Sequence, residues 1–301
     1  MKIAVLGGAG FIGMHLLGAF LGRHSKRVFD KRAPEYDMKR HGSWGLDLSD
    51  AEDWEPVSNW RPDVIVNLIA RLADRDTAIV VLRMADALMA GLTEGWCPHV
   101  VHLSSAAVYG EMDEGQILWL ESSCGLGMNP FMEWVSLYGV DKIVGEIYMT
   151  RLAVAGIPTT IIRPANVYGP GQGGNVVDLF ARRLKAGEPP IINTSAAVTR
   201  DFVHVDDVVA AIVAAIEQPP TYGQLRVYNV GTGIETTLGS LADMMREHLG
   251  GPRFLVDIQR PCGIRRSALD CSRIGEELGW EPNVALAEGL ERTLREEGFL
   301  E

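Results

Sequence analysis

Long apolar runs, cysteine pairs and metal-binding patterns are all missing from this 301-residue sequence. No uncharged apolar stretch reaches the roughly 18 residues that a membrane-spanning helix needs, and no signal-peptide pattern precedes the first glycines. None of the cysteines belongs to a C-x-x-C pair or has a histidine nearby in a recognised metal pattern. The four are Cys97, Cys124, Cys262 and Cys271. We therefore expect a cytoplasmic protein with reduced thiols, no metal ion and no membrane partner.

Positive charge is also scarce. Lys and Arg number 28 against 39 Asp and Glu, which gives a net charge of −11. The short basic clusters at 31–32, 182–183 and 265–266 do not extend into a stripe. Nucleic acid is therefore not an expected partner, although a local basic pocket for a phosphorylated small molecule stays open.

Short apolar runs alternate with longer amphipathic patterns along the first part of the chain, as in KIAVLG followed by FIGMHLLGAFLGRH. Such alternation predicts an α/β fold with a doubly wound parallel sheet of the Rossmann type, covered by helices on both faces. After about residue 170 the rhythm changes to glycine- and proline-rich loops. We therefore predict a main domain at 1–170 plus about 200–228, and a smaller C-terminal substrate-binding lobe at 171–199 and 229–301.

The stretch GGAGFIG follows the first predicted strand and opens the first predicted helix. Its glycines, Gly7 or Gly8 with Gly10 and Gly13, allow a tight turn and a close approach of the backbone to a pyrophosphate at the start of the helix. A plain glycine turn is the alternative. Strand, turn and helix agree in order, which favours a dinucleotide-binding turn.

Acidic residues follow the next two predicted strands. Asp30 ends the second strand, where a carboxylate accepts hydrogen bonds from the adenosine ribose and repels a 2′-phosphate, so NAD is favoured over NADP. Lys31 and Arg32 come next and could serve a 2′-phosphate instead. Asp47 follows the third predicted strand, either as a helix N-cap or as a cofactor contact.

Tyr138 and Lys142 stand four residues apart in the segment YGVDK. On a helix, this spacing brings the two side chains to one face, where an ammonium can act on a phenol. The same spacing occurs by chance in many unrelated proteins. The pair is therefore informative only together with the rest of the chain.

Several motifs in a fixed order now identify a resemblance that covers nearly the whole chain. They are GGAGFIG, Asp47-Leu48, NLIA (67–70), LSSAAVYGE (103–111), YGVDK, RPANVYGPG (163–171), RDFVHVDDV (200–208) and YNVGTG (228–233). The sequence resembles the extended short-chain dehydrogenase/reductase superfamily, and within it the NAD-dependent epimerase/dehydratase group typified by UDP-glucose 4-epimerase. The resemblance implies bound NAD, a nucleotide-sugar substrate and a homodimer formed through the helix that bears Tyr138.

The resemblance also implies roles for individual residues. The residues implied to hold NAD are Gly7, Gly10, Phe11, Ile12, Gly13, Asp30, Lys31, Asp47, Leu48, Leu68, Ala70, Tyr138, Lys142 and Ala165. Phe11 and Ile12 would offer backbone N–H groups to the pyrophosphate, and Asp47 and Leu48 would meet the adenine. The residues implied on the substrate side are Ser105, Asn166, Asn175, Arg200 and Arg260.

The implied catalytic residues are Ser105, Tyr138 and Lys142. Tyr138 would remove a proton from a sugar hydroxyl as hydride leaves the same carbon, while Ser105 hydrogen-bonds that oxygen. Lys142 would hold the nicotinamide ribose and, together with the positive nicotinamide, lower the pKa of the phenol from about 10.

The reaction implied most directly is epimerisation of a UDP- or dTDP-linked hexose through transient oxidation at C4. Dehydratases of the family carry an acidic pair after the catalytic hydroxyl, whereas this chain has Ala106 and Ala107. A ketoreductase or dehydratase of a deoxysugar pathway is the alternative, because RLADRDTAIVV is shorter than usual and Cys262-Gly263 departs from the pattern. A non-catalytic dinucleotide sensor is a third reading, but such relatives lose the tyrosine or lysine retained here.

Overall fold

The chain folds into two compact units in a computed structural model. The structure describes residues 1–20, 24–32, 43–69, 76–110, 118, 120–122, 133–258 and 264–301. The first unit comprises 1–108, 126–163 and 209–228, and the second comprises 109–125, 164–208 and 229–301.

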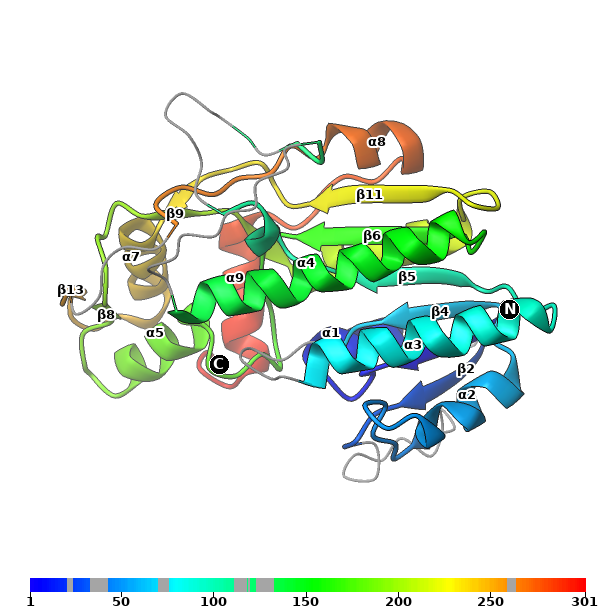
Figure 1. The fold of residues 1–301 in the computed structure, drawn as a ribbon. Helices are drawn as coiled ribbons and strands as arrows, with labels where there is room; N and C mark the ends of the chain where they lie inside the picture. Colours follow the sequence, from blue (N-terminus) through cyan, green and yellow to red (C-terminus); the bar gives the residue numbers. More distant parts are fainter. Residues whose placement is uncertain are drawn as a thin grey trace. The chain divides into compact units, whose positions relative to one another are not determined.

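A seven-stranded sheet forms the centre of the first unit (Figure 1). Its strands, in spatial order, are β11 (Leu225–Val230), β6 (Thr159–Pro164), β5 (His99–Leu103), β4 (Val64–Asn67), β1 (Lys2–Leu6), β2 (Ser25–Phe29) and β3 (Ser43–Trp44). The pairs from β3 to β6 are parallel. The direction of the strand order reverses between β1 and β4, and at such a switch point a parallel α/β sheet binds its ligand.

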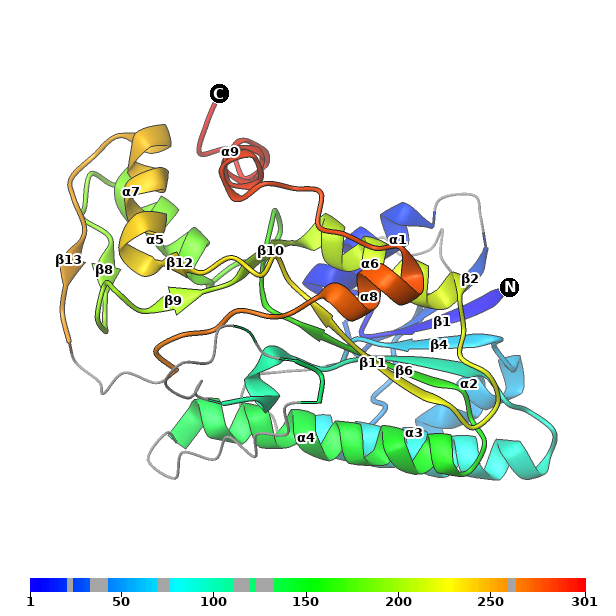
Figure 2. The ribbon, with the colours of Figure 1, turned by 90° about the horizontal axis from the view of Figure 1, so that it is seen from above.

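Helices cover both faces of this sheet. The helical segments are α1 (Phe11–Ala19), η3 (Glu52–Trp54), α2 (Glu55–Trp60), α3 (Asp76–Thr93), η4 (Ala106–Val108), α4 (Glu133–Val154) and α6 (Val205–Glu217), which begins in the second unit. Figure 2 shows α3 and α4 side by side on one face, with α1 and α6 on the other. The predicted doubly wound α/β fold is thereby confirmed.

Burial explains why the central strands read as continuous apolar runs. Every residue of β4 and β5 is buried, as are the last four residues of β1. A strand that is covered on both faces has no solvent-exposed side, so its residues do not alternate between apolar and polar. The main core of this unit gathers side chains from β1, β4, β5, α3 and α4, with Met84 and Met149 at zero exposure.

The second unit combines short paired strands with three longer helices. Its elements are β7 (Asn166–Tyr168), α5 (Val176–Lys185), β8 (Ile191–Ile192), β9 (Thr199–Arg200), β10 (Phe202–His204), β12 (Thr236–Thr237), α7 (Leu238–Leu249), β13 (Leu255–Val256), α8 (Ser272–Leu278) and α9 (Leu286–Glu296). β7 pairs with β10, β9 with β12, and β8 with β13. Side chains of α5, α7 and α9 share a separate apolar core, which gives this unit its own stability.

Three segments of the predicted main domain belong instead to the second unit. They are 109–125, 164–170 and 200–208. Pairing explains the difference at the last two segments. β7 and β10 form a ladder with each other, and the buried carboxylate of Asp201 binds backbone and side-chain groups of 232–233 and 269. These long-range bonds join segments that the sequence separates by about 30 to 70 residues.

Candidate active site

The glycine turn between β1 and α1 requires glycine at particular positions. Gly7 has φ +75°, a left-handed conformation that L side chains rarely adopt. A Cβ atom at Gly13 would lie 2.6 Å from the Cα and carbonyl oxygen of Gly8, so any side chain there would separate α1 from the turn. The turn therefore brings the start of α1 directly against the end of β1.

The first turn of α1 has free capacity for an anion. Gly10 is the N-cap residue, and no side chain among the described residues caps the helix. A Cβ at Gly10 would lie 3.1 Å from the carbonyl oxygen of Gly7, so the glycines keep the concave side of the turn open. The backbone N–H groups of Phe11 and Ile12 lie in this first turn, and these residues fit a pyrophosphate.

Asp30 is tied to the same turn. Its side chain is buried, its Oδ2 accepts a hydrogen bond from Ala9 N at 3.0 Å, and its Oδ1 accepts one from Arg32 N at 2.8 Å. The guanidinium of Arg32 lies beside the turn, with Nη2 3.7 Å from the position of a Cβ at Gly10. The end of β2 therefore brings one carboxylate and one cation to the glycine turn.

Lys31 and Asp47 form an ion pair, with Nζ 2.7 Å from Oδ2. Asp47 Oδ1 also accepts hydrogen bonds from Ser49 N and Oγ, so it caps the turn at 47–50. Burial acts to raise the pKa of Asp47, but the hydrogen bonds from Lys31 and Ser49 hold it below its usual value. Leu48 packs in the core near Trp54, whose indole donates to the Leu48 carbonyl.

The remaining predicted cofactor contacts lie in both units. Leu68 is half-buried after β4, and its N–H donates to the Leu6 carbonyl at 3.0 Å. Ala165 is buried in the second unit, where its N–H donates to the Val230 carbonyl at 2.9 Å. Ala70 lies outside the described residues. The sequence did not single out Ile69, which packs 3.0 Å from the position of a Cβ at Gly7.

Ser105, Tyr138 and Lys142 come together in the first unit. Ser105 follows β5, while Tyr138 and Lys142 lie one turn apart on α4. The Ser105 hydroxyl hydrogen-bonds the phenol of Tyr138. Lys142 Nζ lies 5.7 Å from the centroid of the Tyr138 ring and donates to the Leu103 carbonyl at 2.7 Å. The spacing read from YGVDK therefore corresponds to a real neighbourhood of hydroxyl, phenol and ammonium.

Two glycines of α4 allow this neighbourhood, Gly139 within the YGVDK motif and Gly145 beyond it. A Cβ at Gly139 would lie 2.9 Å from the Ala107 carbonyl oxygen, and one at Gly145 would lie 2.8 Å from His102 Nε2. These contacts let α4 approach η4 and β5 closely. Because Ser105 precedes η4, the close approach at Gly139 holds its hydroxyl beside Tyr138.

Burial controls the acid–base properties of the group. It raises the pKa of Tyr138, and the hydrogen bond from Ser105 opposes that rise. It lowers the pKa of Lys142 to about 8, although the charges of Glu146 and Asp141 act in the opposite direction. In the chain alone, burial raises the Tyr138 pKa above its usual value, whereas the sequence predicts that Lys142 and the nicotinamide together lower it. The phenol is therefore protonated at neutral pH unless further positive charge is supplied.

The predicted substrate-side residues that the structure describes lie in the second unit, apart from Ser105. Asn166 is exposed at the start of β7. Arg200 donates through Nη1 to the carbonyls of Thr199 and Ile264, both at 2.7 Å. Arg260 lies outside the described residues.

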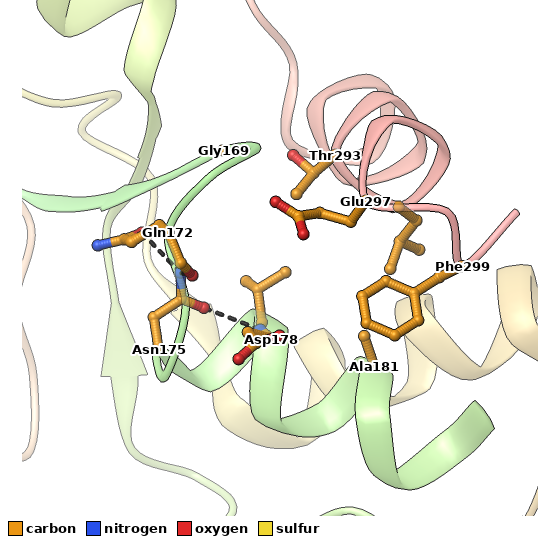
Figure 3. A pocket seen from close by; sticks show the side chains of 10 residues that line it. Gly169, Gln172, Asn175, Asp178, Ala181, Thr293, Glu297 and Phe299 are labelled. Carbon is orange, nitrogen blue, oxygen red and sulfur yellow. Dashed lines mark hydrogen bonds between the residues drawn. The ribbon is translucent and has the colours of Figure 1, made fainter. Parts of the chain in front are cut away.

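Asn175 is engaged locally, at the edge of a small pocket between α5 and α9 (Figure 3). Its Oδ1 accepts from Asp178 N at 2.9 Å and so caps α5, while its Nδ2 donates to the carbonyl and side-chain oxygens of Gln172. Glu297, the C-cap residue of α9, faces this loop and accepts a hydrogen bond from Gly171 N. A substrate role for Asn175 stays a prediction, and it would require these local bonds to open.

No metal site or membrane span is evident in the parts of the chain that the structure describes. Within those ranges, His, Cys, Asp and Glu side chains nowhere gather in threes as a metal ion would need. Similarly, no described helix is long and apolar enough to cross a membrane.

Comparison with known proteins identifies the family of the chain. Residues 3–231 match the model of the NAD dependent epimerase/dehydratase family. The chain is 32% identical to the UDP-glucose 4-epimerase of Mycolicibacterium smegmatis, over 98% of this chain and 97% of that protein. It is 30% identical to the dTDP-L-rhamnose 4-epimerase of Burkholderia thailandensis, over 96% and 93%.

A solved structure gives the same result for the fold. The crystal structure of UDP-glucose 4-epimerase from Thermotoga maritima with UDP-glucose superposes with a TM-score of 0.85 and 29% identity, covering 98% of each chain. The glycine turn, the hydroxyl–phenol–ammonium group and these matches lead to one conclusion: the chain belongs to the NAD-dependent epimerase/dehydratase family.

Proposed function

We propose that this protein is an NAD-dependent nucleotide-sugar epimerase that inverts C4 of a UDP- or dTDP-linked hexose. The observation that carries the proposal is the group formed by Ser105, Tyr138 and Lys142, beside an Ala106-Ala107 segment that offers no acid–base pair for elimination. The similarity to two 4-epimerases over nearly the full chain supports it.

In this proposal the phenol of Tyr138 takes the proton of the C4 hydroxyl and later returns it. The Ser105 hydroxyl positions the same oxygen, and the Lys142 ammonium stabilises the phenolate form of Tyr138. When bound, NAD would supply the hydride acceptor and donor for C4 and a positive charge that would favour the phenolate. The glycine turn, Asp30 and Lys142 hold the cofactor.

We propose further that the first unit binds the dinucleotide and the second binds the nucleotide sugar. Asn166, Arg200 and Arg260 are the proposed contacts to the diphosphate, since an arginine forms charge-assisted bonds to phosphate oxygens. A cytoplasmic location fits the free thiols of Cys97 and Cys271.

A product analysis tests the function directly. Purified protein is incubated with NAD and a panel of UDP- and dTDP-hexoses, and the products are identified by proton NMR while NADH absorbance is followed. We expect a C4 epimer with no net NADH. Stoichiometric consumption of NAD(P)H would instead support the ketoreductase, and a 4-keto-6-deoxy product would support the dehydratase.

Asp30→Asn should reduce the preference for NAD over NADP. The amide keeps one oxygen acceptor, which can serve the N–H of Ala9 or of Arg32 but not both, and it loses the charge that repels a 2′-phosphate. Asp30→Ala should weaken NAD binding more strongly, because it also removes those bonds. Binding titrations of both cofactors measure the effect, and an unchanged NAD/NADP ratio in both variants would refute the assigned role.

We also propose that two copies associate through α3 and α4. Ile79 on α3 and Ile147 and Val154 on α4 are exposed, with Ile147 61% and Val154 84% accessible. Figures 1 and 2 show the two helices side by side. Exposed apolar side chains on adjacent helices favour burial against a second copy of the same face.

Ile147→Glu should therefore convert a dimer into a monomer, because a charge would be buried at the interface. Light scattering after size-exclusion chromatography measures the mass. Leu179→Glu, at an exposed position of α5 in the second unit, is the matched control and should leave the mass unchanged. A wild-type monomer at micromolar concentration, or a dimer that survives Ile147→Glu, would contradict this interface.

A further inference from the structure

A partly buried ion pair lies one helical turn beyond Lys142. Glu146 follows Lys142 by four residues on α4, so the two side chains share a face of the helix. The Glu146 carboxylate accepts hydrogen bonds from Arg163 Nε at 2.9 Å and Nη2 at 2.6 Å, and each side chain of the pair is only 13% exposed. Glu146 is therefore fixed by a bidentate bond to the end of β6.

The same carboxylate is also bound to the strand that leads to Ser105. Ser104 Oγ donates to Glu146 Oε1, and the preceding carbonyl, Leu103 O, accepts from Lys142 Nζ. Two successive residues of the β5 end are thus bonded to two successive turns of α4. The Glu146 carboxylate thus accepts from three donors, one on Ser104 just after β5 and two on Arg163 of β6.

The charges around Lys142 come from several elements. Tyr138, Asp141 and Glu146 lie on α4, His102 lies on β5, and Arg163 on β6 reaches the group through Glu146. Burial and the charge of Lys142 lower the pKa of His102 to about 3, so its ring is neutral. Burial lowers the pKa of Lys142 itself, and the opposing charges are Glu146 first and Asp141 second.

Resting on the proposed function, we propose that Glu146 is a positioning residue whose carboxylate, fixed by Arg163 and Ser104, keeps Lys142 in its ammonium form beside Tyr138. Without that carboxylate, the buried amine becomes neutral at a lower pH and ceases to stabilise the phenolate. Activity at alkaline pH is then lost. In this role Glu146 contacts neither substrate nor cofactor.

The test is a titration of Lys142 in the wild type and in Glu146→Gln. The ε-carbons of lysine are labelled with carbon-13, and the Lys142 signal is assigned by its loss in Lys142→Arg. Because a charge one helical turn away is removed, the pKa of Lys142 should fall by about 0.5 to 2. In the same variant, the alkaline limb of the kcat/KM profile should move to lower pH by a similar amount. At a pH above the alkaline limbs of both proteins, the kcat/KM of Glu146→Gln should then be about 3-fold to 100-fold lower than that of the wild type.

Loss of the Glu146 charge removes the carboxylate that Arg163 binds at a partly buried position, so Glu146→Gln can destabilise the fold. The double variant Glu146→Gln/Arg163→Met removes both charges, and the Lys142 pKa should remain below the wild-type value. Glu94→Gln, which breaks the exposed Arg61–Glu94 pair of the same unit, is the control and should change neither readout.

An unchanged or raised Lys142 pKa in both Glu146 variants would overturn the proposal. Because the NMR titration needs no substrate, it still decides the role of Glu146 if no nucleotide sugar reacts. A lowered Lys142 pKa with no epimerase activity in the wild type would contradict the proposed function alone. A normal wild-type activity with an unchanged pKa in the variants would contradict the role of Glu146 alone.

Discussion

Tyr138→Phe is expected to slow the reduction of bound NAD by a nucleotide sugar by about 10²–10⁴, the usual contribution of a positioned general acid–base. The ring of Tyr138 keeps its place on α4, while only the hydroxyl that Ser105 hydrogen-bonds is removed. Ser105 Oγ keeps its bond from Ala107 N at 3.1 Å, so the fold of this segment should persist. NAD should still bind, since the glycine turn, Asp30 and Lys142 are unchanged.

Single-turnover absorbance measurements with a panel of UDP- and dTDP-sugars give the rate for both proteins. Ser105→Ala is the matched control, because it removes the partner hydroxyl and leaves the phenol, and it should lower the rate less than Tyr138→Phe does. If Tyr138→Phe reduces its cofactor as fast as the wild type, the phenol is not the base. The assignment of the active site would then be wrong.

Lys142→Met is expected to lower both turnover and NAD affinity, yet to stabilise the fold at neutral pH. The side chain of Lys142 is buried, with 2% of the residue exposed, and burial lowers its pKa to about 8 from 10.5. A lysine that is harder to protonate in the folded state costs stability wherever it is charged, here about 3 kcal/mol. Loss of the hydrogen bond to the Leu103 carbonyl destabilises the variant by about 1 kcal/mol. The net gain in the free energy of unfolding is therefore about 2 kcal/mol.

The stability difference between Lys142→Met and the wild type depends on pH. Below the folded pKa of about 8 the penalty is fully present, and it disappears as the pH rises through 10.5, where the unfolded chain also loses the proton. The Tm of Lys142→Met should therefore exceed that of the wild type by a few degrees at pH 7, and this difference should vanish before the pH reaches 10.5, where the lost bond makes the variant the less stable protein.

Circular dichroism melting curves of the two proteins across this range measure the difference. Lys185→Met is the control, because Lys185 also donates to a carbonyl, that of Phe299 at 3.0 Å, but is exposed. It should show no such pH-dependent gain. A Lys142→Met protein that is less stable at pH 7 would mean that the ammonium is better solvated than its burial indicates.

Local patterns in the sequence predict much of this fold. The apolar runs of β1, β4 and β5 and the glycine turn are local features, because burial on both faces and a tight turn restrict residue type at each position. The neighbourhood of Tyr138 and Lys142 follows from helical spacing alone. A catalytic role for the pair is indicated only by the order of the motifs across the whole chain.

Contacts between distant residues could not be predicted in the same way. Glu146 and Arg163 are 17 residues apart, and Ser104 and Glu146 are 42 apart, so no local pattern marks them as partners. Asp201 lies in the RDFVHVDDV motif, but no local pattern indicates that it is fully buried and accepts bonds from Thr232, Gly233 and Leu269. Such partners become visible only when strand order brings segments together.

The fate of the C4 hydrogen tests the central claim most directly. The wild type is incubated with NAD and its best nucleotide hexose carrying deuterium at C4, and the epimer is analysed by NMR and mass spectrometry. Hydride return within one active site predicts an epimer that retains the deuterium at C4, with no exchange with water and no free NADH. An epimer that has lost its C4 deuterium to solvent, or a reduced or dehydrated product in place of an epimer, would contradict the proposed function.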